Sequence, residues 1–181
     1  GGTTGNPKGI VLSNRNFNAL AMQCHLMCDP AKAGDSILAI LPIFHGFGLG
    51  VSIHTTLYIG MKVILVPDFS PRKFGSLIKK YKPNFITGVP TLYEALLTNK
   101  HMNNMDLSYV KYVISGGDSL IPEKNDAVNK FFKQHGADIN IIQGYGMTET
   151  GGPVCAQVLD ATASGSIGIP FPSNEIKICL C

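Results

Sequence analysis

Residues 36–41 read Ser-Ile-Leu-Ala-Ile-Leu and are followed at once by Pro42. A short apolar run that ends at a proline is typical of a strand buried on both faces of a parallel sheet. Short runs that favour extended structure return along the chain, at 62–66, 85–87, 111–115 and 140–143. We therefore expect a strand at each of these positions.

Helical signals fill most of the intervals between these runs. Ser13 can cap a helix over 14–28, in which apolar residues recur on one side at helical spacing. A glycine-containing apolar stretch predicts a second helix over 47–59. Prolines open three further predicted helices, over 71–81, 90–97 and 122–134. Strands that alternate with helices predict an α/β fold with a mostly parallel sheet.

Two other segments have their own patterns. Residues 99–108, rich in Asn and Met, predict a loose loop. From Gly152 onward the chain favours extended structure, and 175–180 alternate like a half-exposed strand. No repeat or long linker divides the sequence, so we expect no domain boundary within it.

The composition excludes several classes of protein. Of the 181 residues, 45% are hydrophobic and 15% are charged, which is too apolar for a disordered chain. The net charge is +3 without a dense basic cluster, so neither nucleic acid nor an anionic membrane is expected as the main partner. The most apolar stretch, 37–58, is interrupted by proline, glycine and histidine and predicts no spanning helix. The absence of a signal-peptide pattern favours a cytoplasmic protein.

The five cysteines predict buried, reduced thiols. Cys24 and Cys28 flank His25 on a predicted helix, but no second Cys/His pair at matching spacing completes a tetrahedral zinc site. Cys179 and Cys181 alternate on the predicted terminal strand. An odd number of cysteines without a secretory context does not support a disulfide framework.

The first motif that could carry chemistry is Gly1-Gly2-Thr3-Thr4-Gly5-Asn6-Pro7-Lys8-Gly9. Its glycines let the backbone approach an anion, and its hydroxyls and ammonium can bond phosphate oxygens. It is not a Walker A loop, because Lys8 follows a proline and precedes Gly9-Ile10 instead of a hydroxyl residue. By composition alone it is also compatible with a turn before a helix.

The second motif is Gln143-Gly144-Tyr145-Gly146-Met147-Thr148-Glu149-Thr150-Gly151-Gly152. Two glycines flank Tyr145, so its ring can lie flat against a planar partner such as a base. Thr148 offers a hydroxyl to a phosphate, and Glu149 offers a hard oxygen ligand to magnesium. A turn with an exposed tyrosine would explain the same residues.

Together, the two motifs resemble the adenylate-forming superfamily, which includes acyl-CoA synthetases, coumarate–CoA ligases, firefly-type luciferases and peptide-synthetase adenylation domains. Three further stretches agree with the family in order and spacing, at 41–49, 114–120 and 165–170. They are similar to its acid-pocket segment, its adenine-edge segment and its Gly-Ser-x-Gly stretch. The resemblance covers nearly the whole chain and implies an incomplete part of the family's large α/β domain.

The resemblance implies a two-step reaction: a carboxylic acid attacks the α-phosphate of ATP, and a thiol, usually that of coenzyme A, then takes the acyl group. It implies that ATP and coenzyme A are co-substrates and that Mg²⁺ is the metal ion. Lys8, Thr148 and Glu149 are the implied catalytic residues, and Glu149 would hold the magnesium. The implied nucleotide-binding residues are Thr3, Thr4, Gly5, Lys8, Gly116, Gly117, Asp118, Gly144, Tyr145, Gly146, Met147 and Thr148.

The resemblance also implies an acid pocket that includes His45, Phe47 and Gln143. The stretch 44–53 would line it with apolar side chains, those of Phe44, Phe47, Leu49, Val51 and Ile53. These offer no charge to pair with the ammonium of an amino acid, whose unpaired burial is costly. A fatty acid is therefore the favoured substrate, and an aryl acid such as a hydroxycinnamate is the alternative. A third hypothesis is a module that binds nucleotide without chemistry. The presence of Lys8, Thr148 and Glu149 speaks against it, because a non-catalytic parent protein has no chemical need for them.

The sequence also departs from the family pattern. Gly1 stands where the family usually has Ser, and Asp118 where many relatives have Pro, Ala or Glu. The family's Thr-Gly-Asp segment and its C-terminal catalytic-lysine domain do not occur in residues 1–181. We therefore expect a partial AMP-binding domain that needs the rest of its parent chain as a partner and that forms negligible acyl-adenylate alone. Peripheral contact with a membrane stays open.

Overall fold

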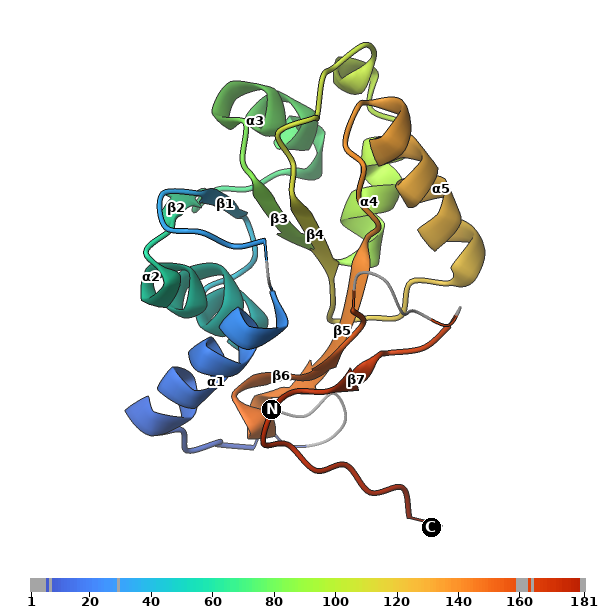
Figure 1. The fold of residues 1–181 in the computed structure, drawn as a ribbon. Coiled ribbons are helices and arrows are strands. Elements are labelled where there is room, and N and C mark those ends of the chain that lie inside the picture. The colour runs from blue at the N-terminus through green and yellow to red at the C-terminus, as the bar shows by residue number, and fades with distance from the viewer. Residues whose placement is uncertain (1–5, 7, 29, 159–162, 164, 180–181) are drawn as a thin grey trace.

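The computed structural model describes residues 6, 8–28, 30–158, 163 and 165–179 (Figure 1). Its strands form a seven-stranded sheet in the order β2-β1-β3-β4-β5-β6-β7. The first five strands in this order, from β2 to β5, are parallel to one another. Strand β6 pairs antiparallel with both β5 and β7. The predicted α/β fold with a mostly parallel sheet is confirmed.

Most elements begin and end within two residues of their predicted bounds. The strands are β1 (Ser36–Ala39), β2 (Lys62–Leu65), β3 (Phe85–Gly88), β4 (Tyr112–Ser115), β5 (Ile142–Met147), β6 (Gly152–Ala156) and β7 (Ile169–Pro170). The α-helices are α1 (Asn14–Met27), α2 (Thr56–Ile59), α3 (Phe74–Tyr81), α4 (Pro90–Leu97) and α5 (Pro122–Gln134). A π-helix, η1 (Phe47–Thr55), precedes α2, and 3₁₀ turns form η2 (Pro71–Lys73), η3 (Lys100–Met102) and η4 (Thr148–Thr150). The largest shift is in β5, which lies later in the chain than the expected strand 140–143.

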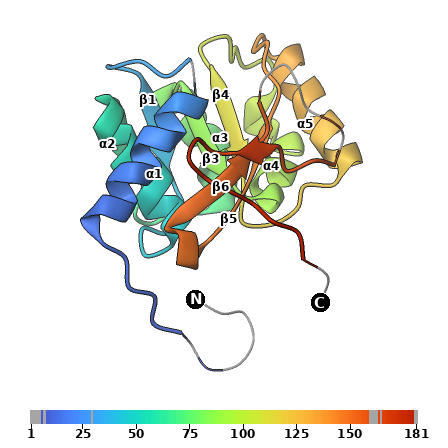
Figure 2. The same ribbon diagram turned by 60° about the horizontal axis from the view of Figure 1, so that its bottom comes forward.

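Helices cover both faces of the parallel strands (Figures 1 and 2). Helices α3, α4 and α5 lie on one face, and α1, η1 and α2 lie on the other. Because side chains alternate along a strand, each strand supplies both cores. Phe85 and Tyr112 pack with α1 residues, whereas Ile86 and Val113 pack with residues of α3, α4 and α5. The core beneath α1 and η1 contains the site described below.

The predicted helix over 47–59 begins as a π-helix, and two of its glycines allow close contact with neighbouring segments. A Cβ atom built at Gly48 would overlap the carbonyl of Pro42, and one at Gly50 would lie 2.7 Å from Leu20 Cδ2. The side-chain-free positions therefore let the wide helix approach both the end of β1 and α1.

Two predictions outside the regular elements are wrong. Residues 99–108 are not loose, because η3 lies within them and the side chains of Met102 and Leu107 are fully buried. The predicted strand 175–180 does not form over 175–179, and Ile178 is 94% exposed. A strand requires a hydrogen-bonding neighbour, and the described residues offer none to this segment.

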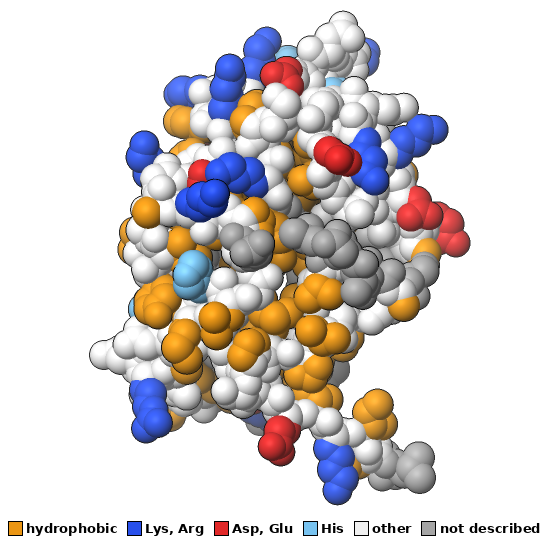
Figure 3. Space-filling view, viewed as in Figure 1, with side chains coloured by type: hydrophobic (Ala, Val, Ile, Leu, Met, Phe, Trp, Pro, Cys, Tyr) orange, Lys and Arg blue, Asp and Glu red, His pale blue; other side chains and the backbone are white. Residues whose placement is uncertain are grey.

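The surface is divided by side-chain type. In the view of Figure 3, Lys and Arg gather mostly over the upper part, where α3 lies, and apolar side chains gather over the lower part. Large exposed apolar side chains on α1 and α2 are those of Met22, Leu26, Leu57 and Tyr58. No helix among the described residues combines the length and the hydropathy that a membrane span requires.

Candidate functional site

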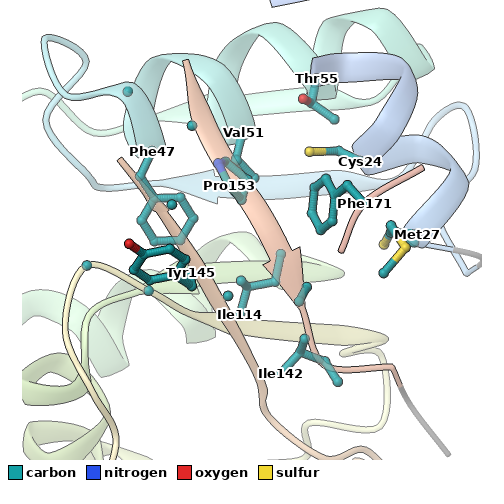
Figure 4. Close-up of a pocket in the computed structure, with 18 of the residues that line it drawn as sticks. Cys24, Met27, Phe47, Val51, Thr55, Ile114, Ile142, Tyr145, Pro153 and Phe171 are labelled. Carbon is teal, nitrogen blue, oxygen red and sulfur yellow. The ribbon is translucent and has the colours of Figure 1, made fainter. Parts of the chain in front are cut away.

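A cavity of about 420 Å³ lies between α1 and η1 on one side and strands β3 to β6 on the other (Figure 4). It follows β4 from Tyr112, at the amino end of the strand, to Gly117 beyond its carboxyl end. The three residue steps of β4, Tyr112–Ser115, alone correspond to about 10 Å. The cavity thus extends along this strand and beyond its end, and its volume lies in the range typical of small-molecule sites.

The mouth of the cavity lies at the carboxyl ends of the parallel strands. Its wall contains Gly116 and Gly117 after β4, Tyr145 on β5, and Thr148 and Glu149 of η4. The register between β5 and β6 shifts between Tyr145 and Gly146, and a Cβ atom at Gly146 would overlap the backbone of Gly152. This close approach requires glycine, and Tyr145, which is 45% exposed, is drawn beside Phe47 at the same end of the cavity (Figure 4).

His45 belongs to this mouth and also makes a backbone bond. Its Nδ1 accepts a hydrogen bond from the backbone N–H of Phe47 at 3.2 Å. A neutral imidazole then carries its proton on Nε2. The ring is exposed and lines the cavity, at the place where the resemblance implies an acid pocket.

The deep end of the cavity is formed by sulfur-containing and aromatic side chains. They are Cys24, Met27, Cys28, Met61, Phe85, Tyr112 and Phe171. Burial raises the pKa of the Cys24 thiol to about 12, an effect that outweighs its hydrogen bond with Thr55. Burial likewise raises the pKa of Tyr112, with smaller contributions from Cys28 and Cys24. Because these groups are neutral at ordinary pH, the deep end is suited to an apolar ligand.

Three of the five side chains expected from the stretch 44–53 do not line the cavity. Phe44 is 91% exposed and Leu49 is 39% exposed, and Ile53 lies outside the lining as well. Phe47 and Val51 line the cavity as expected, and Thr55 joins them, so that the lining residues of this segment are four positions apart. The expected residues were mostly two positions apart, whereas side chains on one face of a helix recur at about every fourth position.

The structure brings together most of the expected site residues. The cavity wall includes His45, Phe47, Gly116, Gly117, Gly144, Tyr145, Gly146, Met147, Thr148 and Glu149. Lys8, Asp118 and Gln143 are not part of that wall. Asp118 is exposed, and its Oδ1 accepts a hydrogen bond from Ser119 N at 2.7 Å. Gln143, expected in the acid pocket, accepts a hydrogen bond from Leu120 N instead.

The first motif lies only partly within the described residues. Thr3, Thr4 and Gly5 are outside them, and Lys8 is exposed. A Cβ atom built at Gly151 would lie 3.9 Å from Leu12 Cδ2, so the segment after Lys8 reaches the loop that carries Glu149. Two segments from opposite ends of the sequence thus meet near the cavity mouth.

Glu149, the expected magnesium ligand, suits a site in which the substrate supplies the other ligands of the metal ion. Among the described residues, no group of three or more His, Cys, Asp or Glu side chains could hold a metal. Mg²⁺ is commonly bound by one or two carboxylates together with substrate phosphates. The single exposed carboxylate of Glu149, at the mouth of the cavity, fits that arrangement.

Sequence reasoning missed the deep end of the cavity. Cys24 and Cys28 were expected as buried thiols; Cys24 is buried and Cys28 is half-buried, and both line the cavity. Phe171 joins them from the far end of the chain. Cys155 is buried as expected, whereas Cys179 is exposed, which corrects the expectation for that thiol; Cys181 lies outside the described residues.

Comparisons with known proteins identify the family of this chain. A model of the AMP-binding enzyme family matches residues 1–180. A long-chain-fatty-acid–CoA ligase of Bacillus subtilis is 34% identical over 98% of this chain and 31% of its own length. The 4-coumarate–CoA ligase 3 of Arabidopsis thaliana is also 34% identical, over 98% of this chain and 32% of its own length.

A solved structure has the same fold. The ATP-bound MatB of Rhodopseudomonas palustris superposes with a TM-score of 0.81 at 26% identity, over 94% of this chain and 32% of that one. The chain therefore spans about a third of the length of the curated relatives that it matches.

Proposed function

This chain belongs to the AMP-binding enzyme family, and we propose that it carries the acid and nucleotide sites of an ATP-dependent acid–CoA ligase that acts on fatty acids. The single observation that carries the proposal is the cavity, which joins a polar mouth at Thr148 and Glu149 to a long apolar interior ending at Cys24 and Phe171. Such a shape suits a molecule with a charged head and an extended hydrocarbon tail.

Each residue at the mouth would act on the head of the substrates. The carboxylate oxygen of the acid would attack the α-phosphorus of ATP, the bond to the oxygen that bridges the α- and β-phosphates would break, and pyrophosphate would leave. Thr148 would donate its hydroxyl to the α-phosphate, and Lys8 would offset charge on the departing phosphates. Tyr145 would stack on the adenine beside Gly116 and Gly117.

Glu149 is the residue proposed to hold Mg²⁺. A bound magnesium ion would neutralise charge on the phosphate oxygens and orient them. The apolar interior would exclude water from the acyl group and leave the carboxylate as the polar part of the acid at the mouth. Transfer of the acyl group to coenzyme A is part of the same proposal for the full-length protein.

The apolar composition of the interior favours acids with a hydrocarbon tail over other acids. Burial of each methylene group contributes about 0.8 kcal/mol, or roughly a fourfold change in affinity. An aryl acid is the second candidate, because the coumarate ligase is as similar to this chain as the fatty-acid ligase is. The aromatic side chains of Phe47 and Tyr145, both on the cavity wall, would suit a ring.

Acid-dependent exchange of pyrophosphate into ATP tests the proposal on the full-length protein. With saturated acids of increasing length we expect KM to fall by roughly fourfold per added methylene until the cavity is filled. Glu149→Gln should reduce exchange by about 100-fold, whereas Glu123→Gln, at the exposed start of α5, should not. Exchange supported by hydroxycinnamates and not by alkyl acids would favour the second candidate. Nucleotide binding without exchange for any acid would favour the non-catalytic module.

A further inference from the structure

Two glutamine side chains connect three segments around the cavity mouth. The Oε1 atom of Gln143, on β5, accepts a hydrogen bond from Leu120 N at 3.2 Å. The backbone N–H of Gln143 donates to Oε1 of Gln157 at 2.9 Å, and Gln157 N donates to Gln143 O at 2.9 Å. The Nε2 atom of Gln157 then donates to Ser166 O at 2.7 Å.

Gln143 holds both ends of the loop that borders the mouth. Its backbone is paired with Ser115, where the chain leaves β4, and its side chain bonds Leu120, where the loop ends. Between these points lie Gly116 and Gly117, which line the cavity. Tyr145, on the other side of the mouth, follows Gln143 by two residues on the same strand. Gln143 therefore connects the loop to the strand that carries the tyrosine.

Gln157 extends this connection to the next segment. Its side chain is buried, with 5% exposure, and both ends of its amide are hydrogen-bonded. A buried amide with both partners in place holds its neighbours in one arrangement, because losing either bond leaves a polar atom without a partner. Ser166 in turn accepts, through Oγ, a hydrogen bond from Gly168 N at 3.0 Å. The Gly-Ser-Ile-Gly stretch at 165–168 is thus attached to β5 through one side chain.

We propose that Gln143 and Gln157 are positioning residues that set the width of the base-binding gap between the loop 116–119 and Tyr145. Gln143 does so directly and Gln157 acts through it. The kinetic part of this inference rests on the proposed function, because it assumes that the gap receives the adenine of ATP. The structural part, the fixing of Leu120, does not depend on the reaction.

Shortening and conservative variants of the full-length protein separate positioning from general stability. In Gln143→Asn the amide stays but no longer reaches Leu120, so the Leu120 amide should exchange its hydrogen about tenfold faster. The KM for ATP should rise by about tenfold while the KM for the acid stays within about twofold. Gln143→Glu keeps an acceptor for Leu120 and should leave both quantities close to wild type. Gln157→Asn should change the Leu120 exchange rate and the KM for ATP in the same direction as Gln143→Asn. Gln134→Asn, at the end of α5, serves as the control.

The outcomes distinguish this inference from the proposed function. Unchanged Leu120 exchange and unchanged KM for ATP in Gln143→Asn would overturn the inference. A rise in the KM for the acid alone would also overturn it and would return Gln143 to the acid pocket. A wild-type protein without acid-dependent exchange would contradict the proposed function, while hydrogen exchange at Leu120 would still decide whether Gln143 holds the loop.

Discussion

The ring of Phe47 lies directly against Gly116. A Cβ atom built at Gly116 would be 3.0 Å from Cε1 and 3.3 Å from Cζ of that ring. Phe47 comes from η1 and Gly116 from the end of β4, so the two residues approach each other from opposite walls of the cavity. Both residues line the cavity near its polar mouth, and the absence of a side chain at position 116 lets the ring of Phe47 pack there without entering the passage toward the apolar interior.

Gly116→Ala should therefore narrow the passage. We expect the KM for the acid to rise by about tenfold, because the phenyl ring of Phe47 must move into the space of the ligand. Gly144→Ala is the matched control, since its Cβ atom would make an ordinary contact, 3.6 Å from Cys155 O. Equal effects of the two substitutions on the KM would contradict the assignment of the passage to Phe47 and Gly116.

The deep end of the cavity should limit the length of the acid. Ala31 is buried there, and Ala31→Leu would fill space that the end of a tail occupies. The KM for the longest acids should rise by about tenfold or more, while short acids keep their KM, since only long tails lose buried methylenes. Ala33→Leu, the same change at an exposed position two residues later, should leave the length profile unchanged. A parallel shift for all acids in Ala31→Leu would argue against a tail at this end.

The raised pKa of Cys24 predicts a pH dependence of stability. A cysteine thiol in water has a pKa of 9.0, and burial raises the pKa of Cys24 in the folded protein to about 12, so between these values the unfolded chain loses a proton that the folded protein keeps. The free energy of unfolding should therefore be unaffected by Cys24 below pH 9 and fall above it, by roughly 1 kcal/mol per pH unit. Denaturant titrations of Cys24→Ala should show a shallower decline between pH 9 and 11 than wild type. Cys179→Ala, at an exposed site, should retain the full decline.

His135 should contribute strongly to the stability of the segment 99–108 through its contact with Met102. Its Nδ1 and Nε2 atoms lie 2.7 and 2.9 Å from the carbonyl oxygens of Phe131 and Met102. His135→Ala removes these contacts and the stacking on Phe131, and we expect the free energy of unfolding to fall by about 2 kcal/mol. His101→Ala, at an exposed position, should change it by less than about 0.5 kcal/mol. Similar losses for the two variants in denaturant titrations would contradict this role.

The sequence predicted those features that depend on local pattern. The largely apolar runs at 36–41 and 111–115 identified strands of the parallel sheet because a strand buried on both faces carries few polar side chains. Ser13 caps α1 as expected, with Asn16 N donating to its hydroxyl at 3.3 Å. The glycines of the motif at 143–152 indicated part of the mouth because close backbone approach, as at Gly146, requires glycine.

Features that depend on distant contacts could not be predicted in this way. Cys24 and Phe171 meet at the deep end of the cavity although nearly the whole chain separates them. The role of Gln143 depends on a hydrogen bond to Leu120 that only the packing of β4 beside β5 creates. Residues 175–179 alternate like a strand, but alternation does not supply a neighbouring strand.

A crystal structure of the full-length protein with a non-hydrolysable analogue of a long-chain acyl-adenylate is the most direct measurement. The account predicts that the adenine lies against Tyr145 beside Gly116 and Gly117, and that the hydrocarbon tail follows Ile114 and Ile142 toward Cys24 and Phe171. A tail bound outside this cavity, with the interior between α1 and β4 empty, would contradict it.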